Sequence, residues 1–494
     1  MRLNILEILN FGRTCKRYQQ ITNDPVLWHR LVACTFNFHQ PLRQSGWKQL
    51  FQELSSSWVY TWGDSSFGRL GHPFTLTRRP DFPHYLPTNL SALRGETIID
   101  LQCGGWSFLA LTNQGRLFAC GRMQGDTFRN QTNLEPGEVP LPEPIKQMAA
   151  GRSFVLLWGK SDSLYILGDF KYQPYRIQLV YPFDNVKVTG ISAGWAKAAV
   201  TTSKGIYVWD VSRHLDPFTL SQSQTTMVEL CPVYNAETNY PDVDITGVAI
   251  GTDFLVYLTH EGDVFKAELP SGALFEDIRA QLIAFKLPLF KGRGGDGEGQ
   301  KLTYISGAYL NFAVFNTSGL VLCGNHSMEP TTEPTVIPEL QNCGVLSVTW
   351  GDYHALALKE DGTVLSWGKE LNFNGCLGQN QPDIAVATVG ARREGTSLVL
   401  ERPTEIADLK GVYAYAIAAG GWQSGTLALP PDDGEHHATS EYLEQNSSDN
   451  IPFQSPPPPP QPGAAPMPPT VGRASQGGSD GGFWWFLSYF FGGS

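Results

Sequence analysis

Short hydrophobic segments separated by glycine-containing turns recur along most of the chain. One unit consists of an apolar segment that ends in glycine, a turn, a second apolar segment, a turn closed by glycine, and a third apolar segment. Its clearest copy runs from Ile98 to Phe118, and a second copy runs from Val345 to Gly368. Apolar segments of this length between glycine turns are typical of β-strands. The pattern therefore predicts an all-β protein built from repeats.

Two glycine positions mark the unit along the chain. The first mark recurs seven times, at Gly105, Gly151, Gly194, Gly251, Gly307, Gly351 and Gly420. The second, which closes the hairpin, recurs at Gly115, Gly205, Gly262, Gly319 and Gly362, with Asp162 in one further copy. Asp fits there because it tolerates a left-handed turn conformation. Spacings of 47, 43, 57, 57 and 43 residues between these second marks are typical of propeller blades. We predict a seven-bladed β-propeller over residues 58–430.

A propeller needs a device that closes its ring. The segment Trp58–Gly63 resembles the outgoing strand of a hairpin, and Gly425–Leu429, at the end of the repeat region, resembles its missing partner. Pairing the two in one blade would hide strand edges that an open sheet exposes. We therefore expect these two segments to be neighbours in space.

The first 50 residues have a helical pattern instead. An apolar stripe at helical spacing predicts one amphipathic helix; its members are Ile8, Phe11, Cys15, Tyr18 and Ile21. Asn23–Pro25 should end that helix, and Val26, Leu27 and Trp28 should begin a second, short one. On pattern alone, this head is a small helical cap that packs on the propeller.

Residues 431–494 differ from both preceding parts in composition. They are rich in Pro, Gly and Ser, include five consecutive prolines at 456–460, and end in the aromatic run Phe483–Phe491. Such a segment cannot bury enough apolar area to offset its ordering entropy, so we expect a disordered tail. Its acidic residues carry much of the net charge of −11. The remaining body is mildly acidic and has no dense Lys/Arg stretch, which argues against nucleic acid as a partner.

Motifs of catalysis, metal binding and membrane insertion are not found in the sequence. The eight cysteines include no Cys-x-x-Cys pair, as expected for free thiols in a reducing compartment. No apolar run is long enough to span a bilayer. No hydrolase, metalloprotease or phosphate-loop motif occurs. We predict no enzyme activity, no catalytic residues, no metal and no cofactor, in a monomer of the cytoplasm or nucleus.

The repeats resemble those of the regulator-of-chromosome-condensation family. The segment Trp62–His72 is similar to that family's strand-and-loop motif, and Gly104-Gly105-Trp106 follows it as in the family. Trp367-Gly368 and Gly375–Gly378 repeat the motif in the last unit. The middle units depart from it, since Trp209-Asp210 lacks the following Gly-x-Leu-Gly. The resemblance covers residues 58 to about 430 and implies a propeller that binds proteins.

The head resembles the second half of an F-box over residues 5–31. A leucine-rich helix, a Cys-Lys-Arg-Tyr stretch and an Asp-Pro-x-Leu-Trp turn follow one another as in that family. The resemblance implies that residues of the first helix contact the adaptor of an SCF-type ubiquitin ligase, namely Leu6, Ile8, Leu9, Phe11 and Cys15. The family's opening Leu-Pro and first helix do not precede Leu3. We therefore expect this chain to bind the adaptor weakly and a version with that helix grafted on to bind it tightly.

Together the two resemblances imply a substrate-recognition subunit of an SCF-type E3 ubiquitin ligase. The head would bind the adaptor, and through it the cullin, while the propeller would bind the protein to be ubiquitinated. One alternative is a guanine-nucleotide exchange factor for a Ran-like GTPase, the activity associated with the repeat family. Another is a propeller scaffold with no link to a ligase.

Two insertions between repeats, Ser212–Asp244 and Asn380–Arg402, are candidates for partner binding because loops on a rigid scaffold usually carry specificity. Aromatic residues dominate interface hot spots, so we expect contacts from Phe218, Tyr234 and Tyr240. The alternative is that these insertions are merely long loops.

Overall fold

The structure is a computed structural model of the whole chain. It describes residues 10, 12–36, 46–72, 83–123, 133–168, 174–180, 185–211, 225–270, 282–292 and 301–430. Compact contacts divide the chain into residues 1–432 and 433–494, and all described elements belong to the first unit. The predicted disordered tail, residues 431–494, lies outside the described residues.

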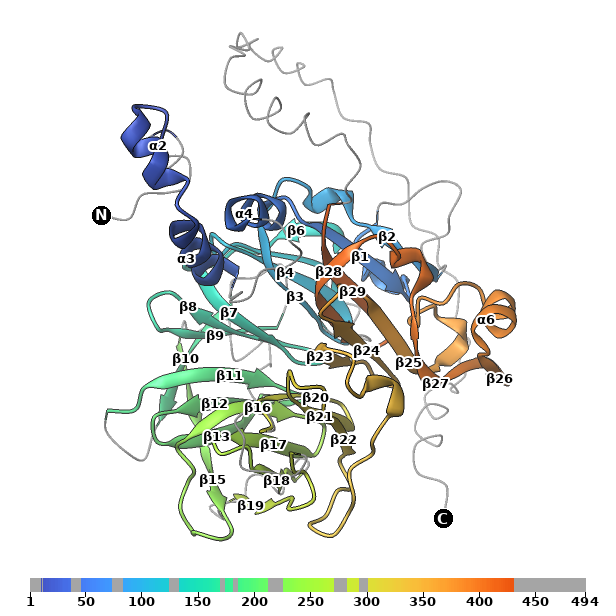
Figure 1. Cartoon of the computed structure of the whole chain (residues 1–494). Coiled ribbons are helices and arrows are strands. Elements are labelled where there is room, and N and C mark those ends of the chain that lie inside the picture. The colour runs from blue at the N-terminus through green and yellow to red at the C-terminus, as the bar shows by residue number, and fades with distance from the viewer. Residues whose placement is uncertain are drawn as a thin grey trace, which may run out of the picture. The chain divides into compact units, whose positions relative to one another are not determined.

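The described helices of the head are α2 (Lys16–Thr22), α3 (Pro25–Phe36) and α4 (Trp47–Ser55) (Figure 1). The prediction of one helix along the stripe from Ile8 to Ile21 is wrong at Cys15, whose backbone is extended, so that α2 begins only at Lys16. The helix predicted after Asn23–Pro25 is confirmed by α3, and α4 was not predicted. Pro25 occupies the first turn of α3, where a missing backbone N–H costs nothing. Trp28 of α3 packs edge-on against Phe51 of α4, with ring centroids 5.4 Å apart, and its indole Nε1 donates to the Thr22 carbonyl at 2.7 Å. This tryptophan therefore joins all three helices.

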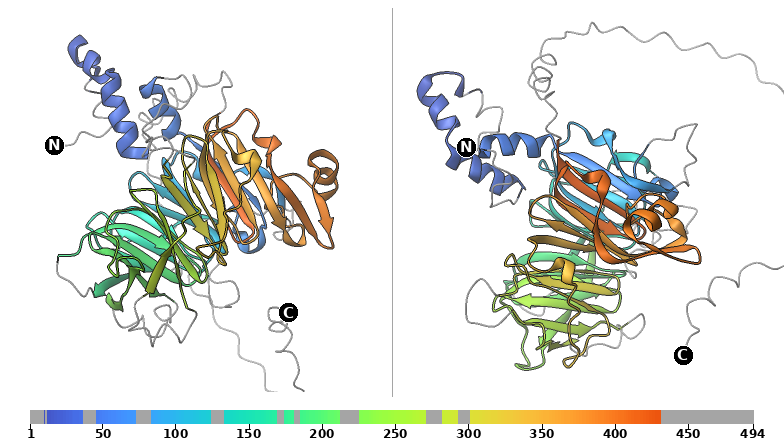
Figure 2. Two further views of the ribbon diagram at one scale, coloured as in Figure 1. Left: turned by 60° about the horizontal axis from the view of Figure 1, so that its bottom comes forward. Right: turned by 45° about the vertical axis from the view of Figure 1, so that its right-hand side comes forward.

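The head packs against the strands and shares their core. Buried side chains of α3 and α4 form one apolar cluster with the strand residues Val59 and Leu429 and with Leu93 of the 3-10 helix Ser91–Leu93. The hydroxyl of Thr97 donates to the carbonyl of Ser55, the last residue of α4, at 3.1 Å. By contrast, α2 extends away from the strands (Figure 2), and Thr22 is the residue it buries. The prediction of a cap that packs on the propeller is confirmed for α3 and α4.

Six sheets make up the rest of the described chain. The first contains β2 (His84–Asn89), β1 (Trp58–Gly63), β29 (Gln423–Leu429) and β28 (Tyr413–Gly420). The second contains β3 (Ile98–Cys103), β4 (Trp106–Thr112), β5 (Leu117–Arg122) and β6 (Asn133–Glu138). The third contains β14 (Thr225–Glu229), β10 (Tyr175–Val180), β9 (Leu164–Leu167), β8 (Val155–Gly159) and β7 (Ile145–Ala150).

The remaining strands include one sheet of eight. In order, it contains β11 (Val188–Ala193), β12 (Lys197–Thr202), β13 (Gly205–Asp210), β15 (Cys231–Asn235), β19 (Leu282–Lys286), β18 (Val264–Glu268), β17 (Phe254–Thr259) and β16 (Ile245–Ile250). A smaller sheet has β20 (Tyr304–Ala308), β21 (Asn311–Phe315) and β22 (Val321–Asn325). The last has β23 (Val345–Trp350), β24 (His354–Lys359), β25 (Val364–Glu370), β27 (Ser397–Glu405) and β26 (Arg392–Glu394).

The ring closes as the sequence predicts. β1 lies between β2 and β29, with Trp58 opposite Ala428 and Trp62 opposite Ser424. Figure 1 shows the blue β1 beside the orange β28 and β29. Strands from the two ends of the repeat region therefore complete one sheet, and neither leaves an open edge there.

The second mark closes its hairpins in the left-handed conformation that the repeat pattern requires. Every one of its six positions has a positive φ, from 65° at Asp162 to 114° at Gly205. A side chain with a Cβ is strained in this region, apart from Asn and Asp. The exchange of glycine for Asp162 therefore keeps the turn, as predicted.

The two insertions contain regular structure that their sequence did not predict. In the first, residues 212–224 lie outside the described residues, while β14 pairs in parallel with β10 and β15 pairs in parallel with β19. The second forms a helix, α6 (Pro382–Val389), and the hairpin of β26 and β27. The description of these insertions as loops is wrong for the described parts. Their strands cover the outer edges of neighbouring sheets, which exposed loops would leave unpaired.

Candidate partner-binding site

The first strand of every repeat lines a central cavity of about 410 Å³. The lining strands are β3, β7, β11, β16, β20, β23 and β28. Each lining segment ends at or just after the first glycine mark, except the β16 segment, which ends at Ile250 immediately before Gly251. The residues that follow the first marks therefore gather around one end of this cavity, which we call the channel mouth.

Backbone hydrogen bonds connect neighbouring repeats around the channel mouth. The amide of Gly105 donates to the Arg152 carbonyl at 2.8 Å, and the amide of Arg152 donates to the Gly194 carbonyl at 3.1 Å. Further on, Thr252 donates to Tyr309 at 2.8 Å, and Asp352 donates to Gly421 at 3.0 Å. These bonds place the backbones of adjacent repeats in direct contact.

That contact explains why the first mark is glycine. A Cβ at Gly194 would lie 2.5 Å from the Gly251 carbonyl oxygen, and one at Gly251 would lie 2.5 Å from the Tyr309 carbonyl oxygen. Any larger residue would push the neighbouring repeat outward, because packed interiors have no spare volume. Glycine at the first mark thus allows the backbones of neighbouring repeats to approach each other closely.

An arginine reaches across the channel mouth to a distant repeat. Nη1 of Arg152 lies 2.9 Å from both carboxylate oxygens of Asp352, 200 residues further along the chain. The guanidinium carbon also lies 3.6 Å from the Trp195 ring centroid and 4.7 Å from that of Trp106. These two cation–π contacts and the ion pair restrict the position of this side chain.

Two tyrosines add to the aromatic rings at the channel mouth. Trp195 stacks on Tyr309 with centroids 5.0 Å apart, and Tyr309 meets Tyr353 edge-on at 5.8 Å. Burial, followed by the hydrogen bond to Tyr353, raises the pKa of Tyr309. We call these six residues the channel-mouth cluster: Trp106, Arg152, Trp195, Tyr309, Asp352 and Tyr353. Asp352 is buried and Tyr353 is exposed, while the other four are half-buried.

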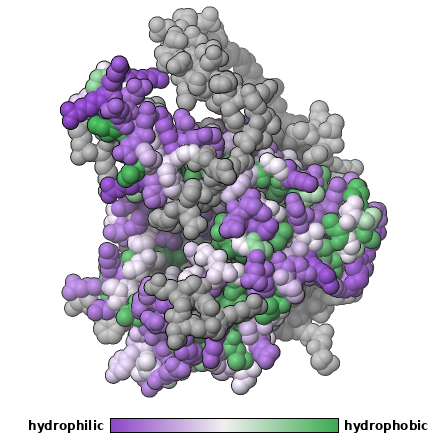
Figure 3. All heavy atoms as spheres, in the orientation of Figure 1, coloured by the Kyte–Doolittle hydropathy of each residue, from purple (hydrophilic) through white to green (hydrophobic). Residues whose placement is uncertain are grey.

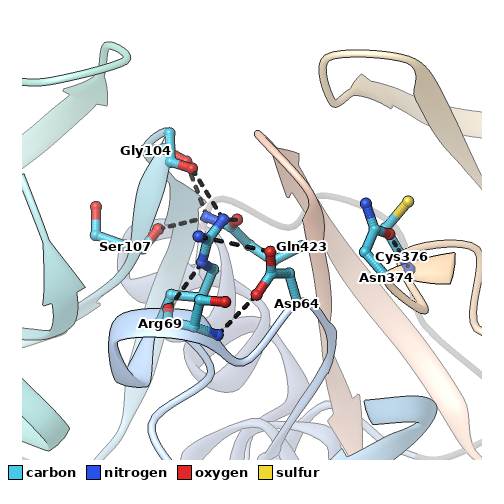
Figure 4. A network of polar contacts seen from close by, with 9 residues as sticks. Asp64, Arg69, Gly104, Ser107, Asn374, Cys376 and Gln423 are labelled. Carbon is cyan, nitrogen blue, oxygen red and sulfur yellow. Dashed lines mark hydrogen bonds and ion pairs between the residues drawn. The ribbon is translucent and has the colours of Figure 1, made fainter. Parts of the chain in front are cut away.

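A buried polar network supports the cluster from below (Figure 4). Arg69, 3 % exposed, donates from Nε to the Ser66 carbonyl at 3.0 Å and from Nη1 to Oε1 of Gln423 at 3.3 Å. Nε2 of Gln423 donates to the carbonyls of Gly104 and Ser107 at 2.9 and 3.1 Å. Burial lowers the pKa of the Arg69 guanidinium. The network joins β29 and the loop after β1 to the turn between β3 and β4, so it also secures the closure.

A buried histidine lies beside this network. Nε2 of His354 is 2.8 Å from the Ser424 hydroxyl, which donates to the Cys376 carbonyl at 2.9 Å. The indole Nε1 of Trp62 donates to the same carbonyl at 3.0 Å. Burial lowers the pKa of His354 to about 4, so its imidazole is neutral at physiological pH. These contacts are those of a packing residue, as its repeat position predicts.

The cluster and the head lie at opposite ends of the strands. β3 starts beside Thr97, which contacts α4, and ends beside Gly104 and the cluster. β29 has the reverse direction: Gln423, its first residue, contacts Gly104, and Leu429, its last, packs in the head's core. A partner at the channel mouth and a partner on the head would therefore bind at different ends.

Three of the eight predicted site residues lie in the described part of the chain. Leu6, Ile8, Leu9, Phe11 and Phe218 lie outside the described residues. Cys15 is exposed at the start of α2. Tyr234 lies in β15, and Tyr240, 73 % exposed, lies in the turn after it. That turn adjoins Gly205, since a Cβ there would lie 2.6 Å from Pro241. Gly205 is a second mark, so Tyr240 is at the end away from the cluster.

Sequence reasoning missed the cluster, although a signal for it was present. Trp106, Arg152, Trp195 and Asp352 each directly follow a first mark. In a closed ring these positions converge, so the residue after each mark is a candidate for the channel mouth. Trp, Tyr and Arg are the residue types that most often form binding hot spots.

Among the described residues, no group of three or more His, Cys, Asp or Glu side chains could hold a metal. Within the described ranges, no helix combines the length and hydrophobicity required to cross a membrane. The channel-mouth cluster, with its aromatic rings and one accessible arginine, can contact a protein segment.

Two segments match models of a known repeat. Residues 58–111 and residues 345–376 each match the Regulator of chromosome condensation (RCC1) repeat. The solved structure of Prp20p from Saccharomyces cerevisiae superposes with a TM-score of 0.54 at 15 % identity, covering 80 % of this chain and 98 % of that one. The all-β propeller fold and its RCC1-type repeats, predicted from the glycine marks, are therefore confirmed.

Curated relatives include F-box proteins. The chain is 24 % identical to F-box protein pof9 of Schizosaccharomyces pombe over 447 residues, 86 % of this chain and 87 % of pof9. It is 36 % identical to SCF-associated factor 1 of Saccharomyces cerevisiae over 90 residues, which are 18 % of this chain and 14 % of that protein. The similarity to pof9 thus extends beyond the two repeat segments to most of both chains.

Proposed function

We propose that this chain is a substrate-recognition subunit of an SCF-type E3 ubiquitin ligase. The observation that carries the proposal is that the head and the channel-mouth cluster occupy opposite ends of one rigidly packed unit. A receptor that connects a ligase adaptor to a substrate needs two separate surfaces in fixed relation. The similarity to pof9 and to SCF-associated factor 1 supports the same reading.

The surface of α2 is suited to an adaptor. Tyr18 is 36 % exposed and Ile21 is 50 % exposed, and both lie on the stripe that the sequence assigns to a helix face together with Cys15. Val26, at the start of α3, is exposed as well. Figure 3 shows hydrophobic surface among polar atoms at this end of the molecule. Burying such side chains against a partner is favourable by about 25 cal/mol per Å² of apolar area.

In this role the chain carries out no chemistry of its own. The adaptor on α2 would connect it to the cullin, and the propeller would hold a protein substrate at the channel mouth. Tethering raises the effective concentration of substrate lysines near a separately bound conjugating enzyme. The indole of Trp28 bonds to Thr22, the last residue of α2, and so connects the adaptor site to the packed helices α3 and α4. Such a subunit would act in the cytoplasm or nucleus.

We also propose that the ring has seven blades. The eight-stranded sheet contains two repeats, β11 to β15 and β16 to β19, joined by the parallel pairing of β15 and β19. Counting it as two blades gives one blade per first glycine mark. The seven strands around the central cavity support this count.

Adaptor capture tests the ligase proposal. The variant Tyr18→Asp/Ile21→Asp places two charges on the exposed apolar face of α2 and should abolish pull-down of purified SCF adaptor, leaving the melting temperature unchanged. Gln20→Asp, on the opposite face of the same helix, is the matched control and should retain the capture of the unaltered chain. If neither this chain nor one with a consensus first helix grafted before Leu3 captures the adaptor, the ligase proposal fails.

Guanine-nucleotide exchange on a Ran-like GTPase is the second candidate. The RCC1-type repeats and the superposition on Prp20p, whose structure was described together with its binding to Gsp1p and histones, favour it. A fluorescent-GDP release assay with a Ran-like GTPase distinguishes the two functions. Catalysed release together with absent adaptor capture would replace the ligase proposal by this one.

A further inference from the structure

We infer that the channel mouth recognises a carboxylate presented by an extended peptide segment, which binds the free edge of the Arg152 guanidinium. The inference rests on the proposed function only in taking the bound peptide to be part of the receptor's substrate. The carboxylate site itself is argued from the geometry of the channel-mouth cluster.

Arg152 has hydrogen-bonding capacity left over. Its Nη1 is used by Asp352, and its guanidinium contacts the rings of Trp106 and Trp195. Within the described residues, Nε and Nη2 donate to no protein acceptor, although the side chain is 19 % exposed. These two nitrogens form the side edge of the guanidinium, whose parallel N–H groups match the two oxygens of a carboxylate.

The cluster fixes that edge before any ligand arrives. The ion pair to Asp352 and the two indoles restrict the rotation of a side chain that would otherwise lose much entropy on binding. The backbone of Arg152 is held as well, since its amide and carbonyl both bond to neighbouring repeats. A ligand therefore meets a donor pair that is already oriented, which is the condition for selective binding.

The surroundings favour an anion over a cation. A cationic side chain would have to displace Arg152 from Asp352 and from Trp195, 3.6 Å away, before it could bind. A carboxylate needs no such displacement. The charge of Asp352 is compensated by its two contacts with Nη1.

Aromatic side chains beside the arginine provide contacts for the rest of the segment. Tyr353 is 38 % exposed, and the rings of Trp195 and Tyr309 are half-buried around the cavity of about 410 Å³. A residue next to the carboxylate can stack on these rings, as aromatic rims of binding sites allow. The carboxylate can come from an acidic side chain or from a peptide C-terminus, because both present the same planar pair of oxygens.

Fluorescence polarisation with three labelled peptides tests the inference on the full chain. The first is Ala-Tyr-Glu-Tyr-Ala with a blocked C-terminus, the second replaces Glu by Gln, and the third is the Gln peptide with a free C-terminal carboxylate. At least one carboxylate peptide should bind about tenfold or more tightly than the blocked Gln peptide, the effect of one charge-assisted bidentate contact. The first and third peptides distinguish the two sources.

Variants locate the contact. Arg152→Lys keeps the charge but removes the planar edge, and it should reduce carboxylate binding to the level of the Gln peptide. Asp352→Asn, the matched variant, should keep binding, because the Asn side-chain oxygen can still accept from Nη1 and the edge formed by Nε and Nη2 is unchanged. Circular dichroism and melting curves on each variant establish that both remain folded.

The inference is overturned if the blocked Glu and Gln peptides bind equally and the free-terminus peptide binds no tighter. It is also overturned by undiminished binding of Arg152→Lys, or if the unaltered chain binds no carboxylate peptide. Loss of binding on Asp352→Asn alone would likewise overturn it and point to a cationic ligand. None of these results depends on the adaptor. A failure here leaves the ligase proposal standing, and absent adaptor capture leaves the peptide result standing.

Discussion

Arg152, two residues after β7, contacts Asp352, two residues after β23, through two contacts of 2.9 Å across the channel mouth. The two residues come from repeats that do not pair with each other in any sheet. Their side chains are 19 % and 11 % exposed, so water screens this ion pair only in part. The pair therefore acts as a brace between two sides of the ring.

A double-mutant cycle measures this brace. Arg152→Gln and Asp352→Asn should each lower the free energy of unfolding by about 1–3 kcal/mol, because each leaves a half-buried charge without its partner. The double variant should lose little more than either single one, since the second change removes the unpaired charge. Denaturant unfolding of all four proteins gives the coupling energy, and strictly additive losses would show that no brace exists.

The first glycine mark should tolerate no side chain. In Gly194→Ala the new Cβ would lie 2.5 Å from the Gly251 carbonyl oxygen, so the variant should lose about 2 kcal/mol or more of unfolding free energy. Gly190→Ala, in β11 just before Gly194, is the matched control, because its Cβ would meet Thr201 at 3.6 Å, an ordinary contact. It should change stability by about 0.5 kcal/mol or less. Equal effects of the two substitutions would contradict the role assigned to the mark.

Closure by β29 should control the stability of the whole ring. Deletion of residues 422–430 removes a strand that pairs with both β1 and β28, and it removes Gln423 from the buried network. The melting temperature should fall by many degrees, since ladder hydrogen bonds are lost and the ring opens. A chain that ends at Pro430 retains β29 and should melt like the full chain. An unchanged melting curve for the deletion would rule out this closure.

Acid should destabilise the protein partly through His354. Burial lowers the pKa of this residue to about 4 from 6.5, so the folded state favours the neutral imidazole. Its contribution is complete above about pH 6.5 and is lost as the pH falls from 6.5 toward 4, on the order of 3 kcal/mol in total. His354→Asn should melt lower at pH 7.5 but with a flatter pH dependence between 6.5 and 4. Parallel melting-temperature curves would assign the acid sensitivity to other groups.

The head should unfold together with the strands. Leu50 of α4 is fully buried in the core shared with β29, so Leu50→Ala should lower the unfolding free energy by about 2–5 kcal/mol. Ile21→Ala, on the exposed face of α2, should leave it nearly unchanged. Calorimetry should show a single transition for both variants. A separate low-temperature transition of the head would contradict the common core.

The sequence by itself determined the repeat unit, the glycine positions that mark it, and the pairing of the first and last strands that closes the ring. The second marks are local signals, because a left-handed turn selects glycine or Asp whatever surrounds it, and Asp162 follows that rule with a φ of 65°. The pairing of Trp58–Gly63 with the final strand was also predictable, since each segment lacks a hairpin partner in its own repeat. The end of the first helix at Asn23–Pro25 and the helix that follows were predictable too, whereas the apolar stripe gave no sign that Cys15 is extended and that α2 starts after it.

The tertiary structure decided which of these residues meet. Ring closure brings Arg152 and Asp352 together from 200 residues apart, and nothing near either residue in the sequence indicates the other. The same holds for the parallel pairing of β15 with β19 and for the packing of α4 on β29, which join segments with no local relation. Periodicity in a sequence reports the conformation of each repeat, whereas contacts across the ring depend on how many repeats close it and on the angle between them.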